Sequence, residues 1–191
     1  MRHGYGVQSL VAMIGLGLIV QSAAPAIAQQ APPGCTAEHH DDFDFWIGTW
    51  NVYAPDDGAY QGLNRITVDP GHCLIREDWQ GAGGSTGHSM NFHDPFENAW
   101  RQVWVSSGAI IDYTGGLDET GAMVLNGQIH YPANGVTAPF RGIWTPLEDG
   151  RVRQHFDQQT ANGEWQAWFT GIYVRVDEDP RAAEAAAIRG E

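Results

Sequence analysis

The 191-residue sequence contains no lysine, so all ten of its positively charged side chains are arginines. Without lysine, Schiff-base chemistry on a side-chain amine is excluded. Positive charge is also scarce beside the 23 acidic residues, and the formal net charge of -13 repels a phosphate backbone at long range. Nucleic-acid binding is therefore not expected.

Long hydrophobic runs are also scarce, apart from one near the start of the chain. A positive start at Arg2 precedes an apolar stretch from about Val7 to Val20, and Ala26-Ile27-Ala28 supplies a small-x-small cleavage site. The stretch is shorter than the roughly 20 residues of a comfortable membrane span, so no stable span is predicted after cleavage. Residues 1–28 are interpreted as a signal peptide, with an uncleaved N-terminal anchor as the alternative. The predicted location is periplasmic or secreted.

Cysteine is limited to Cys35 and Cys73, the only internal pair available. In an oxidising compartment these two residues are expected to form a disulfide, with two separate buried thiols as the alternative. The bridge would hold the N-terminal segment, residues 29–42, against a strand of the folded domain.

Turn signals are abundant and regularly spaced over residues 43–176. They fall at 55–58, 69–71, 81–84, 94–98, 106–108, 118–121, 132–135, 147–150 and 160–163. The segments between them are rich in β-branched and aromatic residues and several alternate in polarity, as half-buried strands do. In 100–106, Trp100, Gln102 and Trp104 share one face. In 164–176, Trp165, Phe169 and Tyr173 are predicted to oppose Trp168.

Short connections imply antiparallel neighbours, and closing about ten such strands into an up-and-down barrel removes the two exposed edges. The predicted fold is therefore an all-β barrel over residues 43–176, with a two-sheet sandwich as the competing fold. Ten strands enclose a wide interior, which leaves a cavity unless large aromatic side chains fill it. Residues 177–191 follow as a flexible, loosely attached tail.

The segment Phe43 to Trp50, with the sequence FDFWIGTW, resembles the start of the first strand of calycin barrels. There a Gly-x-Trp opens the strand and its tryptophan plugs one end of the barrel. More closely, the chain resembles a bacterial family of lipocalin-like proteins of unassigned function. The matching stretches are 72–79, 87–94, 100–105, 144–154 and 171–175, and the resemblance spans about residues 38–176.

The resemblance implies a barrel with a ligand-sized interior. It also implies that Trp50 packs near a basic residue from the end of the chain, for which Arg175 is the candidate. Calycins of the fatty-acid-binding type carry a helical lid between their first two strands. The short link from Ala54 to Tyr60 leaves no room for such a lid, which argues against a fatty-acid carrier.

If the resemblance sets which strand faces point inward, neighbouring strands bring polar and aromatic side chains together inside the barrel. The predicted ligand-binding residues are Glu77, Trp79, Ser89, Asn91, Gln102, Trp104 and Gln154, with Trp144 and Tyr173 from two further matching stretches. Such a set is typical of a polar patch that orients a ligand between aromatic walls. The alternative is an internal hydrogen-bond network that fixes the shape of the barrel without a ligand.

Histidines and carboxylates offer two other functions. Nitrobindin-like ten-stranded barrels bind haem through one histidine, and His155 is the first position to test. However, Arg151, Arg153 and His155 are spaced two residues apart and share one face of the strand, which the arginines mark as outward. The run from His39 to Asp42 is interpreted as a solvated segment, because adjacent residues rarely converge on one metal ion.

The favoured function is an exported protein that holds a small, partly apolar molecule in the barrel interior. No metal or cofactor is predicted, and the sequence does not set an oligomeric state. The first alternative is an enzyme that uses the same cavity, with a buried Glu77 or a histidine as acid or base. The second is a haem-binding barrel.

Overall fold

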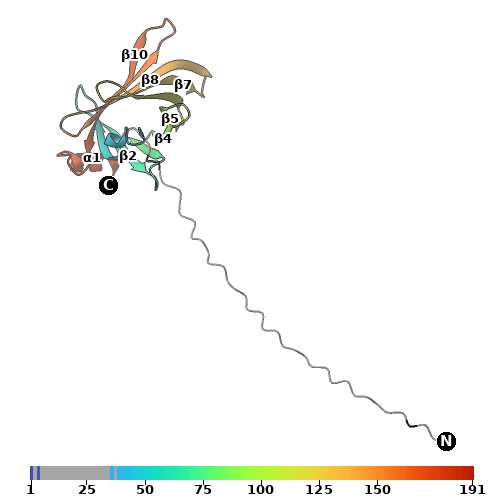
Figure 1. Cartoon of the computed structure of the whole chain (residues 1–191). Coiled ribbons are helices and arrows are strands. Elements are labelled where there is room, and N and C mark those ends of the chain that lie inside the picture. The colour runs from blue at the N-terminus through green and yellow to red at the C-terminus, as the bar shows by residue number, and fades with distance from the viewer. Residues whose placement is uncertain (2–3, 5–34, 37) are drawn as a thin grey trace. The chain divides into compact units, whose positions relative to one another are not determined.

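The ten turn-separated segments become ten strands of one closed antiparallel barrel in a computed structural model, which describes residues 1, 4, 35–36 and 38–191 (Figure 1). The strands are β1 (Gly48–Tyr53), β2 (Tyr60–Val68), β3 (Ile75–Gly81), β4 (Thr86–Asp94), β5 (Ala99–Ser106), β6 (Ile110–Leu117), β7 (Met123–Tyr131), β8 (Val136–Pro146), β9 (Val152–Gln159) and β10 (Trp165–Arg175). The predicted signal peptide lies outside the described residues, apart from Met1 and Gly4. In the described part of the chain, no helix has both the length and the apolarity to cross a membrane.

Each strand pairs with its neighbours in sequence, and β1 pairs with β10 to close the wall. The closing register places Trp50 opposite Arg175 and Tyr53 opposite Ile172. The predicted up-and-down barrel is therefore confirmed, and the sandwich alternative is wrong. Tight turns make this topology accessible, because Gly150 and Gly163 adopt φ values of 82° and 87°, where side chains with a Cβ are strained.

The predicted alternation holds in β5 and fails in β10. Trp100 and Gln102 are both buried on the inner face of β5. In β10 a bulge between Ala167 and Phe169 shifts the register by one residue. As a result Trp168 and Phe169 do not point to opposite faces of the strand as predicted. The ring of Trp168 lies 5.5 Å from that of Phe140. A sequence pattern with a strict period of two has no means of placing such a bulge.

Aromatic side chains fill one end of the barrel. The 3-10 turn η1 (Asp44–Trp46) precedes β1, and both Phe43, just before the turn, and Trp46, its last residue, are completely buried. Phe43 stacks on Trp46 at 4.9 Å, and Trp46 lies 5.6 Å from Trp144. Trp50 lies at the same end, with the Arg175 guanidinium 4.3 Å from its ring centroid, as the resemblance implied. We call Phe43, Trp46, Trp50 and Trp144 the aromatic plug.

The described part of the N-terminal segment, residues 35–36 and 38–42, is attached to the barrel beside this plug. The predicted disulfide between Cys35 and Cys73 is present, and Cys35 N donates to Gly71 O at 2.7 Å. Cys73 lies in the link between β2 and β3, so the bridge holds the segment against a turn rather than the predicted strand. In the same link, His72 Nε2 lies 2.8 Å from Asp44 Oδ1 of η1.

The run from His39 to Asp42 is only partly solvated: His39 and Asp41 are exposed as predicted, whereas His40 and Asp42 are not. His40 is 9% exposed, and the Trp100 indole donates to the His39 carbonyl at 2.8 Å. The described residues 38–42 therefore contact the barrel. Among the described residues, no group of three or more histidine, cysteine or acidic side chains is arranged to hold a metal ion.

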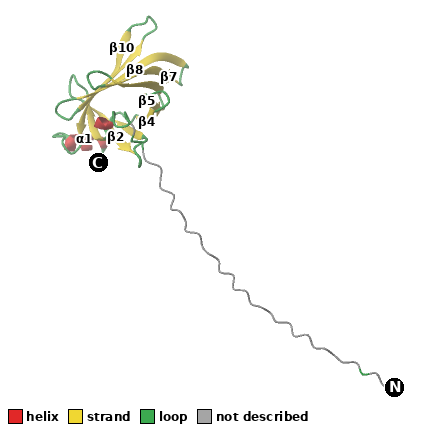
Figure 2. Ribbon diagram, in the orientation of Figure 1, coloured by secondary structure: helices red, strands yellow, loops and turns green. Residues whose placement is uncertain are grey.

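The predicted loose tail is also wrong, because polar contacts attach residues 177–191 to the outside of β1 and β2. Helix α1 (Ala182–Arg189) lies beside β2 (Figure 2). The buried Asp179 carboxylate accepts hydrogen bonds from Asn51 Nδ2 at 2.7 Å and from the Tyr53 hydroxyl at 2.5 Å. Arg189 donates to Tyr60 and to Asn51.

Asp179→Ala is expected to release the C-terminal helix while leaving the barrel folded. The change strands the buried polar groups of Asn51 and Tyr53, which costs about 1–3 kcal/mol. Burial opposes the charge on Asp179, but the hydrogen bonds from Tyr53, Arg181 and Asn51 outweigh it and lower the pKa of this carboxyl. The attachment is therefore present above the ordinary aspartate pKa and weakens as pH falls through the lowered value. Hydrogen exchange of the α1 amides measures both effects, and α1 protection unchanged in the variant would contradict them.

Candidate ligand-binding cavity

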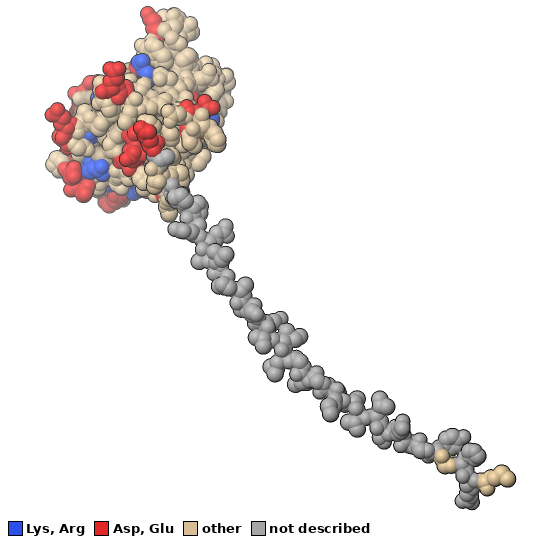
Figure 3. All heavy atoms as spheres, viewed as in Figure 1, with Lys and Arg blue, Asp and Glu red and all other residues tan. Residues whose placement is uncertain are grey.

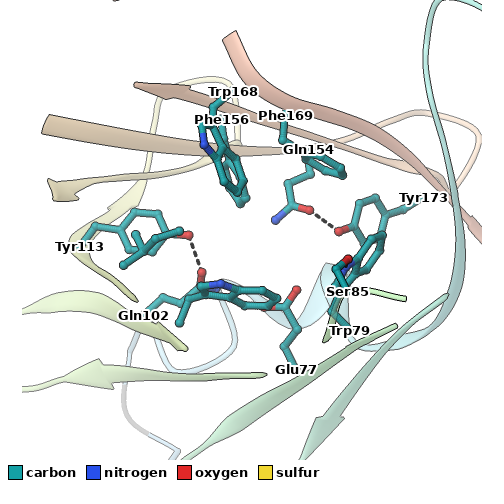
Figure 4. A pocket seen from close by; sticks show the side chains of 12 residues that line it. Glu77, Trp79, Ser85, Gln102, Tyr113, Gln154, Phe156, Trp168, Phe169 and Tyr173 are labelled. Carbon is teal, nitrogen blue, oxygen red and sulfur yellow. Dashed lines mark hydrogen bonds between the residues drawn. The ribbon is translucent and has the colours of Figure 1, made fainter. Parts of the chain in front are cut away.

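Beyond the aromatic plug, the other half of the barrel contains a cavity of about 220 Å³ (Figure 4). An apolar cavity of roughly 150 Å³ holds benzene, so this one accommodates a small molecule with one ring or two fused rings. The twelve lining residues come from five strands and one turn. They are Glu77, Trp79, Ser85, Gln102, Trp104, Ile111, Tyr113, Gln154, Phe156, Trp168, Phe169 and Tyr173.

Six of the nine predicted ligand-binding residues line this cavity, namely Glu77, Trp79, Gln102, Trp104, Gln154 and Tyr173. The other three do not. Ser89 and Asn91 are buried on β4 and form hydrogen bonds to lining residues. The Ser89 hydroxyl donates to Glu77, and Asn91 accepts from Gln102. Trp144 belongs to the aromatic plug and contacts the cavity wall from behind, with its ring 5.4 Å from that of Phe156.

The outer part of the cavity is walled by aromatic rings from facing strands. Trp79 of β3 lies 6.2 Å from Phe169 of β10, in an edge-to-face arrangement. Phe156 of β9 lies 5.9 Å from Phe169 and 6.1 Å from Trp168. These rings supply an apolar surface that suits a flat ligand body.

A glycine on the neighbouring strand makes room for one of these rings. A Cβ atom at Gly87 would lie 2.1 Å from Cζ2 of Trp104, so the indole lies directly over the glycine backbone. The ring is rigid and therefore must move as a whole if Gly87 gains a side chain. Gly87 on β4 thus sets the position of Trp104 in the wall.

Gly87→Ala is expected to destabilise the protein by about 1–3 kcal/mol, because the added methyl group overpacks the Trp104 ring. Urea unfolding measures the cost, and the indole Nε1–H resonance of Trp104 should shift in the folded variant. Gly83→Ala is the matched control, since a Cβ at Gly83 meets nothing within 4 Å. Equal stabilities of the two variants would show that Trp104 does not rest on Gly87.

The inner part of the cavity is polar and centres on the carboxyl group of Glu77, which is 5% exposed. Asn64 Nδ2 donates to Glu77 Oε1, and the Ser89 hydroxyl donates to Oε2, both at 2.7 Å. Asn91 Nδ2 in turn donates to Ser89 Oγ at 2.9 Å. The side chain of Glu77 is thus fixed by neutral groups on the strands on either side of it.

Two arms extend this network around the barrel. On one side, Asn64 Nδ2 donates to the Tyr173 hydroxyl at 3.1 Å, and Tyr173 donates to Gln154 Oε1. On the other side, Gln102 Nε2 donates to Asn91, and the Tyr113 hydroxyl donates to Gln102 Oε1. We call this set the polar belt; its members are Asn64, Glu77, Ser89, Asn91, Gln102, Tyr113, Gln154 and Tyr173.

Burial raises the pKa of Glu77 to about 7, against the opposing effect of the hydrogen bonds from Asn64 and Ser89. No arginine or histidine among the described residues forms an ion pair with this carboxyl. Burial also raises the pKa values of the Tyr113 and Tyr173 hydroxyls well above 10, and the nearby charge of Glu77 adds to the effect. Near neutral pH, Glu77 is therefore the belt member that exchanges a proton.

Sequence reasoning missed six lining residues, namely Ser85, Ile111, Tyr113, Phe156, Trp168 and Phe169. Phe156 lies two residues after the predicted Gln154 and shares its face of β9, and Tyr113 follows the alternation of β6, so the sequence carried a signal for both. Trp168 carries no such signal, because it enters the cavity through the bulge in β10.

Ser85 lies within Gly83-Gly84-Ser85-Thr86-Gly87, which fits the Gly-x-Ser-x-Gly pattern of nucleophile elbows. An elbow needs a turn from a strand into a helix, whereas this segment links β3 to β4 in a hairpin. Ser85 Oγ accepts a hydrogen bond from the Trp79 indole at 3.4 Å, and no histidine in the described part of the chain contacts it. The pattern therefore does not mark a catalytic serine here.

None of the twelve residues that line the cavity is a histidine. His155 points outward, as its alternation predicted. Its Nδ1 lies 2.7 Å from Thr170 Oγ1, and its Nε2 lies 3.0 Å from Asp157 Oδ1. A haem iron needs an axial donor inside its pocket, and these residues do not provide a histidine for that role.

Compared with models of protein families and with curated proteins, the chain matches none of them.

Proposed function

We propose that the protein is an exported binding protein that holds one small, partly apolar molecule in the cavity of its barrel. The observation that carries this proposal is the division of the interior into a filled half and an open half. Large side chains pack the plug completely, whereas about 220 Å³ stays open between the aromatic wall and the polar belt. Cavities of this kind, apolar with a few fixed polar groups, are typical of small-molecule sites.

Unused hydrogen-bonding capacity in the cavity supports a ligand over a purely structural network. Gln154 Oε1 accepts from Tyr173, while its amide nitrogen points into the cavity and donates to no described side chain (Figure 4). One hydrogen of Gln102 Nε2 is likewise left over after its bond to Asn91. A network built only to fix the barrel would leave fewer donors directed at empty space.

Export is supported by the residue pattern at 1–28 and by the Cys35–Cys73 disulfide, which is typical of proteins from oxidising compartments. The proposed location is periplasmic or secreted. Native mass spectrometry of the protein isolated from its own host tests for a bound molecule.

A fluorescence titration tests binding directly, because Trp79, Trp104 and Trp168 line the cavity. Small aromatic compounds should quench the wild type saturably, and Trp104→Ala should weaken their binding. Trp165→Ala is the control, since Trp165 is 43% exposed and stacks under Arg141 outside the cavity. Absence of a co-purified molecule, together with no saturable quenching by any compound, would refute the proposed function.

Proton transfer is a second candidate function, favoured by the pKa of about 7 for Glu77 at the cavity surface. A carboxyl with this pKa is half-protonated near neutral pH and can act as acid or base on a bound molecule. Any turnover found in a substrate screen should disappear in Glu77→Gln, which keeps the shape of the side chain. Turnover that survives this change would exclude the second candidate.

A further inference from the structure

We propose that the ligand is a small organic cation, a protonated amine on a ring-containing body, and that its charged nitrogen pairs with Glu77. The inference rests on the proposed function and adds the chemical class of the ligand. It is carried by the unpaired carboxyl, by the rings around it and by the charge of the whole chain.

The first observation is that Glu77 has polar neighbours but no counter-charge. Its two hydrogen bonds come from the neutral side chains of Asn64 and Ser89. No cationic side chain within the described ranges pairs with it, although buried carboxylates normally have an ionic partner. Each carboxylate oxygen retains a lone pair after these bonds, so the group can still accept from a ligand that donates N–H. A protonated amine supplies both the charge and the donors that the site lacks.

The second observation is the aromatic wall above the carboxyl. Trp79 lies on the same strand and the same face as Glu77, and Trp104 and Phe156 also line the cavity. Electron-rich ring faces attract cations, and tryptophan does so most strongly. Figure 4 shows the rings of Trp79 and Phe156 and the side chain of Glu77 bordering the same space. The cavity therefore offers a cation both an ion pair and aromatic faces, and offers the rest of the ligand an apolar surface.

The third observation argues against negatively charged ligands. A ligand carboxylate or phosphate would have to approach Glu77 without an arginine in the cavity lining to receive it. The chain carries a net charge of -13, and Figure 3 shows acidic side chains spread over the visible face of the barrel. This field attracts cations toward the protein and repels anions. Fatty acids and other organic anions are thus disfavoured.

Protonation of Glu77 gives the pairing a characteristic pH dependence. The titratable groups facing Glu77 are the hydroxyls of Tyr113 and Tyr173, which stay neutral below pH 10; the charge of Asp78, the next residue of β3 on its opposite face, adds to the raised pKa of Glu77. A pKa of about 7 means that the carboxylate form disappears as pH falls from 8 to 5. An alkylamine with a pKa near 10 stays protonated throughout this range. Its affinity should therefore fall with decreasing pH, whereas that of a neutral ligand should change little.

Isothermal titration calorimetry with three probes of one skeleton tests the proposal: 2-phenylethylamine, 2-phenylethanol and phenylacetate. At pH 8 the amine should bind the wild-type protein at least about 30-fold more tightly than the alcohol, with phenylacetate weakest. In Glu77→Gln the advantage of the amine should disappear, so that the amine and the alcohol bind with similar affinity. Glu119→Gln, which removes an exposed carboxyl, should behave as wild type.

The wild-type protein alone provides a second measurement, independent of how well the variant folds. The affinity for the amine should fall by at least about 20-fold from pH 8 to pH 5, because the ionised fraction of Glu77 falls from roughly nine-tenths to about one-hundredth. The cation proposal is overturned if the alcohol binds as tightly as the amine, if the amine keeps its advantage in Glu77→Gln, or if its affinity is independent of pH. In each of these cases the binding function itself survives. If none of the probes or panel compounds binds, the proposed function fails and the cation proposal fails with it.

Discussion

Glu77→Gln is expected to stabilise the folded barrel at pH 8 by about 3 kcal/mol. Burial raises the pKa of Glu77 from 4.5 to about 7, so the folded protein holds a proton that the unfolded chain releases. The contribution of Glu77 to stability is therefore most favourable below pH 4.5, is lost progressively between pH 4.5 and about 7, and reaches its full deficit above that range. A shift of this size corresponds to about 3 kcal/mol. The glutamine avoids this cost because it carries no charge.

Urea unfolding at pH 4.5 and pH 8 measures this difference. Wild type and Glu77→Gln should be similar at the lower pH and diverge at the higher one, while Glu119→Gln should follow wild type at both. The glutamine still accepts from Asn64, and the Ser89 hydroxyl can turn to accept from its amide, so the network is retained. Parallel pH profiles for wild type and Glu77→Gln would mean that the carboxyl is not protonated on folding.

The ligand explains why the protein keeps Glu77 although its buried carboxyl destabilises the fold. Residues that destabilise a protein are commonly kept where function requires them. In this account the bound cation supplies the missing counter-charge of Glu77 and removes the destabilisation. Binding of 2-phenylethylamine should accordingly raise the unfolding temperature more at pH 8 than at pH 5.

Trp144→Ala should have the largest effect on stability, a loss of about 3–5 kcal/mol. Trp144 is completely buried and joins the aromatic plug to the cavity wall, with ring contacts to Trp46 at 5.6 Å and to Tyr113 at 6.0 Å. Its removal leaves a void beside Phe156, which extends the cavity toward the plug. The folded variant should therefore also bind larger ring systems that wild type rejects.

Urea unfolding with Trp165→Ala as the control measures the first part of this prediction. Trp165 is half-exposed and contacts Arg141, so its removal should cost no more than about 1 kcal/mol. Titration with naphthalene and anthracene derivatives measures the second part. If Trp144→Ala is as stable as the control, the plug is not the rigid floor of the cavity.

Turn chemistry and strand composition are local properties, and the sequence therefore predicts the barrel well. Asp-Gly and Asn-Gly pairs such as those ending at Gly150 and Gly163 determine where the chain reverses. The Cys35–Cys73 disulfide followed from there being one internal pair. Alternation shows which residues share a face of a strand but not which face points inward, so Glu77 and Gln102 were assigned to the interior from the family resemblance.

Local sequence patterns do not predict features that depend on a single irregularity in a strand or on polar contacts between residues far apart in the chain. The bulge that turns Trp168 inward changes one register step and leaves the composition of β10 unaltered. The attachment of Asp179 joins residues 126 or more positions apart and has no apolar periodicity to reveal it. The sequence also gave no measure of depth along the barrel, so Trp144 was grouped with the cavity although it belongs to the plug.

The indole N–H resonances of the eight tryptophans offer the most direct test of the account, because they report separately on the plug, the cavity and the outer surface. Titration of ¹⁵N-labelled protein with 2-phenylethylamine at pH 8 should shift the signals of Trp79, Trp104 and Trp168. Those of the plug tryptophans and of Trp165 should stay in place. Shifts confined to the plug or to Trp165, or no shift at saturating amine, would contradict a ligand-binding cavity above Glu77.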